Sequence, residues 1–296
     1  MTNAPRSGSP RTVLAPMDRR VAIINHAAST LRPRASRPRD EPFRLTILRG
    51  TLLVLAPWAA IVALWYAVHY SGLVNPALVP TPDAVARQFM QLAQQRLPLD
   101  IWVSTRRVFL GVAFGILLAV PVGFVLGWYR ETRRFIDPLL NFFRALPPIA
   151  LIPLVIVYFG IGEVAKVVIL FYASFFAGVI VMYEGIAQIS PLYVRVARTL
   201  GARDDEIFRK VIVPLAVPHM LTALRVSLGV AWATLVASEL IAAQTGLGSL
   251  IQNAAAFFQL DTIYVGIICI GFIALIMDLV LRAVARRLVA WQERIA

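Results

Sequence analysis

The chain has 296 residues, of which 59% are hydrophobic and 15% are charged, and its mean hydropathy is +0.73. Soluble domains average about 45–50% apolar and about 25% charged residues, so this composition excludes an ordinary soluble globular protein. The net charge of +13 would suit a nucleic-acid-binding protein. Such domains are far less apolar, however, and the charge instead predicts basic loops on the cytoplasmic face of a membrane. The single cysteine, Cys269, excludes an intramolecular disulfide and a cysteine-based metal cluster, and the three scattered histidines suggest no metal site.

Residues 1–49 form a separate region with ten arginines, three acidic residues and many prolines and serines. Because this composition cannot bury enough apolar surface to fold, we expect a disordered cytoplasmic tail. The tail could bind anionic lipid headgroups, or it could be solvated and carry no function. Its only apolar patch, Val21–Ile24, is too short for the core of a secretory signal peptide.

Six apolar stretches follow, each long enough for a helix that crosses a bilayer, which needs about 20 mostly apolar residues. These expected spans lie near residues 52–70, 108–129, 138–160, 164–183, 219–243 and 262–281. The predicted fold class is all-α, a polytopic membrane protein with about six transmembrane helices. We expect the transmembrane domain to cover residues 50–288 and a short cytoplasmic tail to cover residues 289–296.

The distribution of basic residues predicts how the chain is oriented. Six spans place both termini on the same side of the membrane. When the long N-terminal region is left out, twelve basic residues fall on that side and five on the other. Because basic residues concentrate in cytoplasmic loops, both termini and the loop 185–216 are predicted to be cytoplasmic.

The second expected span carries a small residue at every fourth position. These residues are Gly111, Gly115, Ala119, Gly123 and Gly127. Small side chains on one face let another transmembrane helix approach closely, so the pattern predicts a helix–helix contact. A flexible hinge at Pro121 is the alternative.

The loop 185–216 is predicted to contain two short helices. Ser190–Pro191 is a typical helix start, and Gly201 is a typical helix end. Acidic residues at 204–206 favour the start of a second helix, which Pro214 is expected to stop. One face of the first helix is apolar, through Tyr193, Val196, Ala197 and Leu200. On physical grounds alone, a helix pair lying on the lipid surface would explain this loop almost equally well.

This loop also resembles the EAA loop of bacterial ABC importer permeases. That pattern reads EAA, three residues, Gly, nine residues and I-x-L-P, and this chain has Arg195-Val196-Ala197, Gly201 and Val211-Ile212-Val213-Pro214 at the same spacing. Arg195 replaces the first Glu of the pattern. Two longer stretches, Phe143–Lys166 and Leu224–Ile251, are similar to the third and fifth spans of nitrate, sulfonate and taurine importer permeases. The second stretch is most similar to the taurine-type members.

The resemblance implies a type I ABC importer permease fold in the bacterial inner membrane. It implies a pair of identical permease subunits, two ATP-binding cassette subunits that bind ATP and Mg, and a periplasmic binding protein. The cargo would be a small anion, taurine or a related aliphatic sulfonate, moved from periplasm to cytoplasm, with nitrate or another small anion as the alternative. The implied ATPase-coupling residues are Arg195, Val196, Ala197, Arg198, Leu200, Gly201, Ala202, Arg203 and Pro214.

The chain itself is not expected to be an enzyme or to hold a cofactor. It contains no G-x-x-x-x-G-K-[ST] nucleotide-binding loop. Gly246-Leu247-Gly248 looks like a phosphate loop, but it falls on the predicted periplasmic side, so we expect a tight turn. A membrane-embedded enzyme would need clustered His, Asp or Glu within the spans. A secondary transporter would more often show broken helices and paired acids near the midplane. ATP dependence of uptake separates these classes.

Polar residues within the spans supply candidates for a translocation pathway. They are Ser174, Trp232, Thr234, Ser238 and Glu239. The hydroxyl groups could instead bond to their own helix backbones. Glu239 would repel an anion, so a structural role bonded to the loop 244–252 is the alternative for it. Arg225 and Asp278 lie at matching depths and are predicted to form a structural charge pair, with snorkelling to the interface as the alternative.

Overall fold

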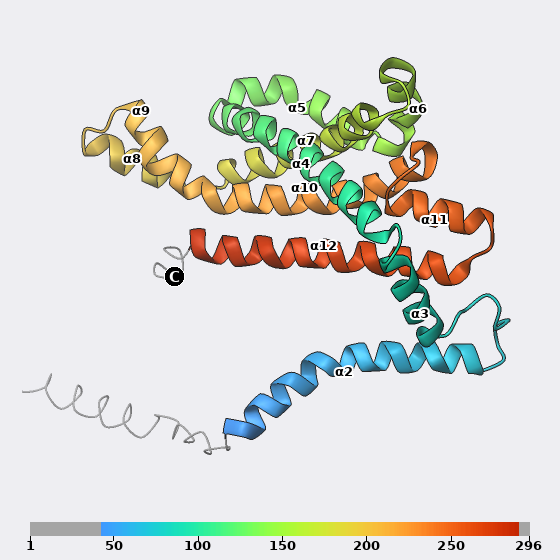
Figure 1. Cartoon of the computed structure of the whole chain (residues 1–296). Helices are drawn as coiled ribbons and strands as arrows, with labels where there is room; N and C mark the ends of the chain where they lie inside the picture. Colours follow the sequence, from blue (N-terminus) through green and yellow to red (C-terminus); the bar gives the residue numbers. More distant parts are fainter. Residues whose placement is uncertain (1–42, 290–296) are drawn as a thin grey trace, which may run out of the picture. The chain divides into compact units, whose positions relative to one another are not determined.

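The computed structural model describes residues 43–289, and all regular structure in that range is helical (Figure 1). The chain divides into two compact units, Met1–Ile61 and Val62–Ala296, and the junction falls within helix α2 (Phe43–Tyr70). The expected N-terminal tail lies outside the described residues as far as residue 42, and residues 43–49 form the first turns of α2. Residues 290–296 of the expected C-terminal tail also lie outside the described residues.

The larger unit continues with ten α-helices and one π-helical turn. In chain order these are α3 (Pro82–Ala93), α4 (Leu97–Trp128), α5 (Arg130–Ala145), α6 (Pro148–Phe159), α7 (Glu163–Ala187), α8 (Pro191–Thr199), α9 (Asp204–Ile207), the π turn (Phe208–Ile212), α10 (Val213–Ala242), α11 (Leu247–Ala256) and α12 (Leu260–Leu288).

Four helices of the described chain are long and apolar enough to cross a membrane. They cover Leu97–Trp128, Glu163–Ala187, Asp204–Ile241 and Leu260–Leu288. A fifth candidate is the pair α5 and α6, which passes the same test when the two helices are taken together. The expected first span falls on α2, where the apolar stretch Leu55–Tyr70 is shorter than the others. The chain is therefore an all-helical polytopic membrane protein.

The predicted seam of small residues packs α4 against α7, which confirms a close helix–helix contact. A methyl group added to Gly111 or to Gly123 would lie only 2.3 Å from a Cβ atom of α7. Helix α4 continues through Pro121 without a break. The partners across the seam are Gly111–Leu170, Gly115–Ser174, Gly123–Met182 and Gly127–Ile186. The residue numbers increase in the same direction along both helices, so α4 and α7 run parallel.

The chain between two parallel spans must return across the membrane, and α5 and α6 make this return as a broken span. The two helices meet at an angle of 89°. At the break, Leu146 and Pro147 both have extended backbone, with ψ angles of 118° and 125°. A residue before proline is disfavoured in helical conformation, and the Pro147–Pro148 pair applies this restriction twice. The continuous span expected at 138–160 is thus corrected to two helices.

Pro214 does not stop the second helix of the loop, so that expectation was wrong. Helix α9 passes through the π turn at 208–212 directly into α10. Within this turn the Val213 N–H donates to the Phe208 carbonyl, five residues back. The wider register relieves the crowding that a proline ring causes in an α-helix, and a proline at the start of α10 needs no N–H bond.

The helix directions give the larger unit two distinct ends. Helix α10 runs antiparallel to α7, because Gly185 faces His219 while Ser227 Oγ donates to the Ser174 carbonyl at 2.8 Å. Figure 1 shows α8 and α9 at one end of α10 and α11 at the other. We call the first of these the basic end, because it gathers Arg130, Arg133, Arg134, Arg195, Arg198, Arg203, Arg209, Lys210, Arg282, Arg286 and Arg287.

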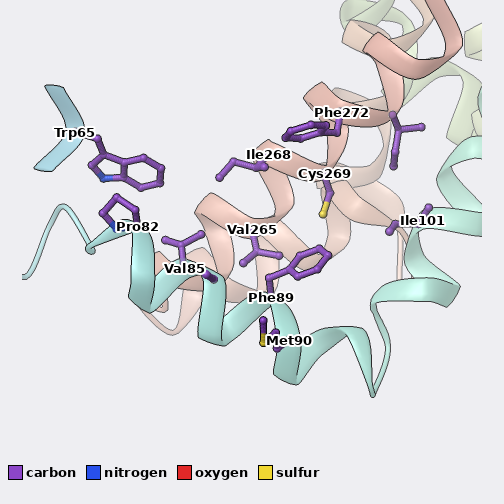
Figure 2. Close-up of a pocket in the computed structure, with 12 residues that line it drawn as sticks. Trp65, Pro82, Val85, Phe89, Met90, Ile101, Val265, Ile268, Cys269 and Phe272 are labelled. Atoms are coloured by element: carbon purple, nitrogen blue, oxygen red, sulfur yellow. The ribbon is translucent and has the colours of Figure 1, made fainter. Parts of the chain in front are cut away.

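Helices α3 and α11 lie at the opposite end and were not anticipated. Thr81 Oγ1 accepts from the Ala84 N–H at 3.3 Å and Pro82 follows it, which repeats the start signal of Ser190–Pro191. Helices α3, α4 and α12 line an open apolar pocket of about 540 Å³, with Cys269 in its wall (Figure 2). Trp65 borders this pocket and stacks on Tyr264 with ring centroids 5.2 Å apart.

We predict that Gly111→Ala destabilises the protein, because the new Cβ would collide with the Leu170 Cβ. Overpacking of this kind costs about 1–3 kcal/mol. The matched control is Gly229→Ala, since a Cβ there meets nothing within 4 Å. The thermal midpoint of the purified protein in detergent should fall for Gly111→Ala and stay level or rise slightly for Gly229→Ala. Equal midpoints for the two variants would contradict the packing of α4 on α7.

Candidate functional site

Helix α8 has a well-defined cap at each end. Ser190 Oγ accepts from the Leu192 N–H at 3.3 Å. At the other end, the Gly201 N–H donates to the Arg198 carbonyl and the Ala202 N–H donates to the Ala197 carbonyl, both at 3.0 Å. This pair of bonds is a Schellman motif, and Gly201 has the positive φ of +81° that the motif requires. The prediction that Gly201 ends this helix is confirmed.

Helix α8 has one packed face and one uncovered face. On the packed face, Val194 and Ala197 contact the hydrophobic cluster that includes Phe124, Ile207 and Ile212. On the other face, four large apolar side chains are between 51% and 82% exposed. They are Leu192, Tyr193, Val196 and Leu200. The expected apolar face is therefore divided, because Ala197 faces inward while its neighbours remain uncovered.

A second constellation, the buried charge network, lies at the opposite end of the bundle. Its centre is Arg107, which is 1% exposed. One guanidinium nitrogen donates to Glu239 Oε1 at 2.6 Å and to the Thr245 carbonyl at 2.7 Å. Two other nitrogens bond to Glu163, with Nε at 2.7 Å from Oε2. Arg107 therefore joins α4 to α7, to α10 and to the loop that follows α10.

The same network holds the start of α11. Three successive backbone N–H groups at this start each donate to a buried side chain of α4 or α10. The bonds run from Gly246 to Asp100 Oδ1 at 2.8 Å, from Leu247 to Ser104 Oγ at 2.9 Å and from Gly248 to Glu239 Oε2 at 2.8 Å. Ser104 Oγ in turn donates to Glu239 Oε1 at 2.8 Å. The chain's own carboxylates thus occupy the helix start that looked like a phosphate loop in the sequence.

Every acid of the network is paired with a base, which explains how its centre can be buried. The three acids are Asp100, Glu163 and Glu239, and the bases are Arg96, Arg107 and Lys166, with the half-exposed Arg106 reaching Glu163 at 3.8 Å. Buried charges are tolerated when they are paired and hydrogen-bonded. The geometry therefore favours the structural role for Glu239. The role of Arg107 could not be predicted from the sequence, because its partners lie 56, 132 and 138 positions further along the chain.

The other pathway candidates differ in how their polar atoms are satisfied. Thr234 Oγ1 donates to the Val230 carbonyl at 2.9 Å and Ser238 Oγ to the Leu235 carbonyl at 2.8 Å, both within α10. Ser174 Oγ and Trp232 Nε1 are buried and have no hydrogen-bond partner within residues 43–289. Ser174 and Trp232 are therefore the two candidates with a free polar atom.

Arg225 and Asp278 lie in contact. Arg225 Nε donates to Asp278 Oδ1 at 2.7 Å, and Arg282 Nε donates to the other carboxylate oxygen at the same distance. The Arg225 side chain is 51% exposed, so the contact stabilises less than a buried pair would. Its importance for folding stays a prediction. In the described part of the chain, no group of three or more His, Cys, Asp or Glu residues could hold a metal ion.

We predict that Glu239→Gln destabilises the protein rather than merely slowing transport. The amide would replace one acceptor oxygen by a donor that faces an N–H group. Arg107 would also lose the negative charge of Glu239 that pairs with it. Breaking a buried pair costs about 3–5 kcal/mol. The control is Glu131→Gln, whose side chain is 87% exposed. A thermal midpoint of Glu239→Gln within the range of the control would show that the network does not hold this end together.

Comparisons with known proteins agree with this architecture. A family model described as "Binding-protein-dependent transport system inner membrane component" matches residues 111–290. A probable ABC transporter permease protein of Brucella abortus is 45% identical, and the alignment covers 83% of this chain and 98% of that protein. The taurine transport system permease protein of Escherichia coli is 34% identical, with 86% and 94% covered. Permeases named for aliphatic sulfonate and for bicarbonate transport match as well.

A solved structure supports the fold independently. The inward-facing MetNI methionine ABC transporter has a TM-score of 0.59 to this chain at 20% identity, covering 66% of this chain and 97% of that one. That likeness concerns the fold alone. From the matched family and its relatives, the chain belongs to the binding-protein-dependent inner-membrane components, as a multi-pass ABC transporter permease of the taurine, sulfonate and bicarbonate group rather than an ATPase.

Proposed function

We propose that this chain moves taurine or a related aliphatic sulfonate from periplasm to cytoplasm. It would act as one of two identical permease subunits, with both termini cytoplasmic. Two separate ATPase subunits would bind ATP and Mg, and a periplasmic binding protein would deliver the cargo. Membership of the family supports the assembly with ATPase subunits and a binding protein. The 34% identity to a taurine transport permease supports taurine as the cargo.

The uncovered apolar face of α8 is the main structural support for the proposed ATPase partner. Leu192, Tyr193, Val196 and Leu200 lie on a helix that is capped at both ends and backed by a packed cluster. A rigid helix that presents contiguous apolar side chains marks a protein or membrane interaction site. Because the chain has no nucleotide-binding loop, an ATPase from another chain is the partner that an ABC permease needs at this place.

The packing behind α8 supports a route by which ATPase closure would reach the membrane spans. The cluster behind α8 includes Phe124 from α4 and Met182 from α7, together with Ile207 and Ile212 beside the π turn. Interiors packed this closely transmit displacement instead of absorbing it. A movement of α8 would therefore be passed to α4, α7 and α10 together.

The candidate pathway residues support only weak binding of cargo within the spans. Ser174 Oγ and Trp232 Nε1 offer one free polar atom each, while Thr234 and Ser238 are bonded to their own helix. We therefore expect affinity to reside mainly in the binding protein. A simple anion is the second candidate cargo, because a bicarbonate transport permease is 28% identical to this chain.

We predict that Gly201→Val uncouples transport from ATP hydrolysis. A β-branched residue strains the positive φ at this position and costs about 1 kcal/mol or more, whereas asparagine tolerates it. No atom lies within 4 Å of a Cβ at Gly201, so the effect is confined to the backbone of the helix end. The measurements are taurine uptake and ATP hydrolysis by the complete transporter in liposomes, together with co-purification of the ATPase.

The matched control for this experiment is Gly201→Asn, which should retain uptake and co-purification. Full coupling in Gly201→Val would contradict a docking role for α8. If the wild-type transporter moves bicarbonate in an ATP-dependent manner but does not move taurine, the proposed cargo is wrong and the proposed mechanism stands.

A further inference from the structure

A cavity of about 490 Å³ lies at the break between α5 and α6, against α7 and α10. Most of its lining is apolar, and two of its residues are charged, Arg144 and Glu184. Irregular backbone at membrane depth is tolerated where it lines a cavity or is buried in protein. The break at Leu146–Pro147 is such a place, since Leu146 itself lines the cavity.

Arg144 and Glu184 differ in their pairing from Arg107, Glu239 and Asp278, which all form ion pairs. Across residues 43–289, neither Arg144 nor Glu184 makes an ion pair or a side-chain hydrogen bond, although both line the same cavity. Both residues are exposed, and Glu184 lies in the last turn of α7 at the basic end. Charged residues that line a cavity between spans often serve transport.

The two charges lie at different levels along the direction of transport. The Phe143 ring stacks on Phe176 with centroids 5.5 Å apart, so Arg144 lies beside the middle of α7. Glu184 is eight residues further along α7, which corresponds to about 12 Å at 1.5 Å per residue. The cavity therefore presents a cation near the helix break and an anion nearer the basic end.

We propose that this cavity is a transit site for a small zwitterion, whose anionic group pairs with Arg144 and whose ammonium group pairs with Glu184. The inference rests on the proposed function and assigns a chemical class to its cargo. An aminosulfonate such as taurine carries both charges, whereas bicarbonate, nitrate and a plain alkanesulfonate carry only the negative one. A zwitterion compensates Arg144 and Glu184 at once, while a simple anion leaves Glu184 uncompensated and is repelled by it.

The test measures ATP-dependent uptake by the complete transporter in liposomes, with two probes. The probes are taurine and isethionate, which has a hydroxyl group in place of the ammonium group of taurine. The variants are Arg144→Gln and Glu184→Gln. The matched controls are Arg134→Gln and Glu131→Gln, which change an exposed pair on α5 whose side chains are 84% and 87% exposed. Stimulation of ATP hydrolysis by the binding protein checks that each variant is folded and assembled.

Glu184→Gln should lower taurine uptake by about tenfold or more, as loss of a charge-assisted contact does, and should not lower isethionate uptake. Arg144→Gln should lower uptake of both probes. Exchanging the two charges, Arg144→Glu with Glu184→Arg, should restore part of the taurine uptake, because a zwitterion can bind in the reversed orientation.

If the wild type moves taurine and Glu184→Gln does not differ from Glu131→Gln, the zwitterion site is overturned and the proposed function stands. Equal losses of taurine and isethionate uptake in Glu184→Gln would also overturn it, because the effect would not depend on the ammonium group. A wild type that hydrolyses ATP in response to the binding protein but moves no taurine would reject the proposed cargo and the site together.

Discussion

The close approach of α4 and α7 is the constraint on which the rest of the larger unit depends. Lipid offers little hydrophobic drive for helix association, so membrane helices hold together through close packing of small residues. Here four glycines of α4 face side chains of α7 with no room for a methyl group. This register makes the two helices parallel, and the chain between them must therefore cross back as the α5–α6 pair. It also brings Arg107 of α4 beside Glu163 of α7, where the buried charge network forms.

The two ends of the bundle are stabilised in different ways, and this difference suits a transporter. At the network end, buried ion pairs and backbone bonds fix the start of α11 to α4 and α10. At the basic end, α8 is exposed on one side, and α9 continues into α10 through a π turn. Such π-helical turns often occur at functional sites. This arrangement fits the proposal that one end is a fixed point and that α8, at the other end, binds a partner.

Much of the fold could be predicted from the sequence, because the signals are local. The seam from Gly111 to Gly127 and the cap at Gly201 depend on residue size and on backbone conformation at single positions. The Thr81–Pro82 start of α3 carries the same local signal as Ser190–Pro191. The continuation through Pro214 could not be predicted, because a π register leaves no mark in the hydrophobic pattern. The break at Pro147 could not be predicted, because the apolar stretch 138–160 is long enough for one continuous helix.

The site was less predictable, since ion pairs form between residues far apart in the sequence. Arg107 and Glu239 are 132 positions apart, and only the helix packing brings them together. The Arg225–Asp278 contact could be anticipated from matching depth on consecutive antiparallel spans. The third member, Arg282, was not anticipated. Charge counts give the orientation of a membrane protein, but they do not show which charges meet.

The central claim, that α8 is the docking surface for a separate ATPase, is tested most directly by cross-linking. The chain's one cysteine, Cys269, is buried, so Cys269→Ser gives a background without reactive thiols. A new cysteine at Val196 can then be compared with one at Leu73, which is 87% exposed and lies outside α8. We expect Val196→Cys to cross-link to the ATPase subunit in the assembled complex and Leu73→Cys not to do so. Cross-linking from Leu73→Cys alone would contradict it.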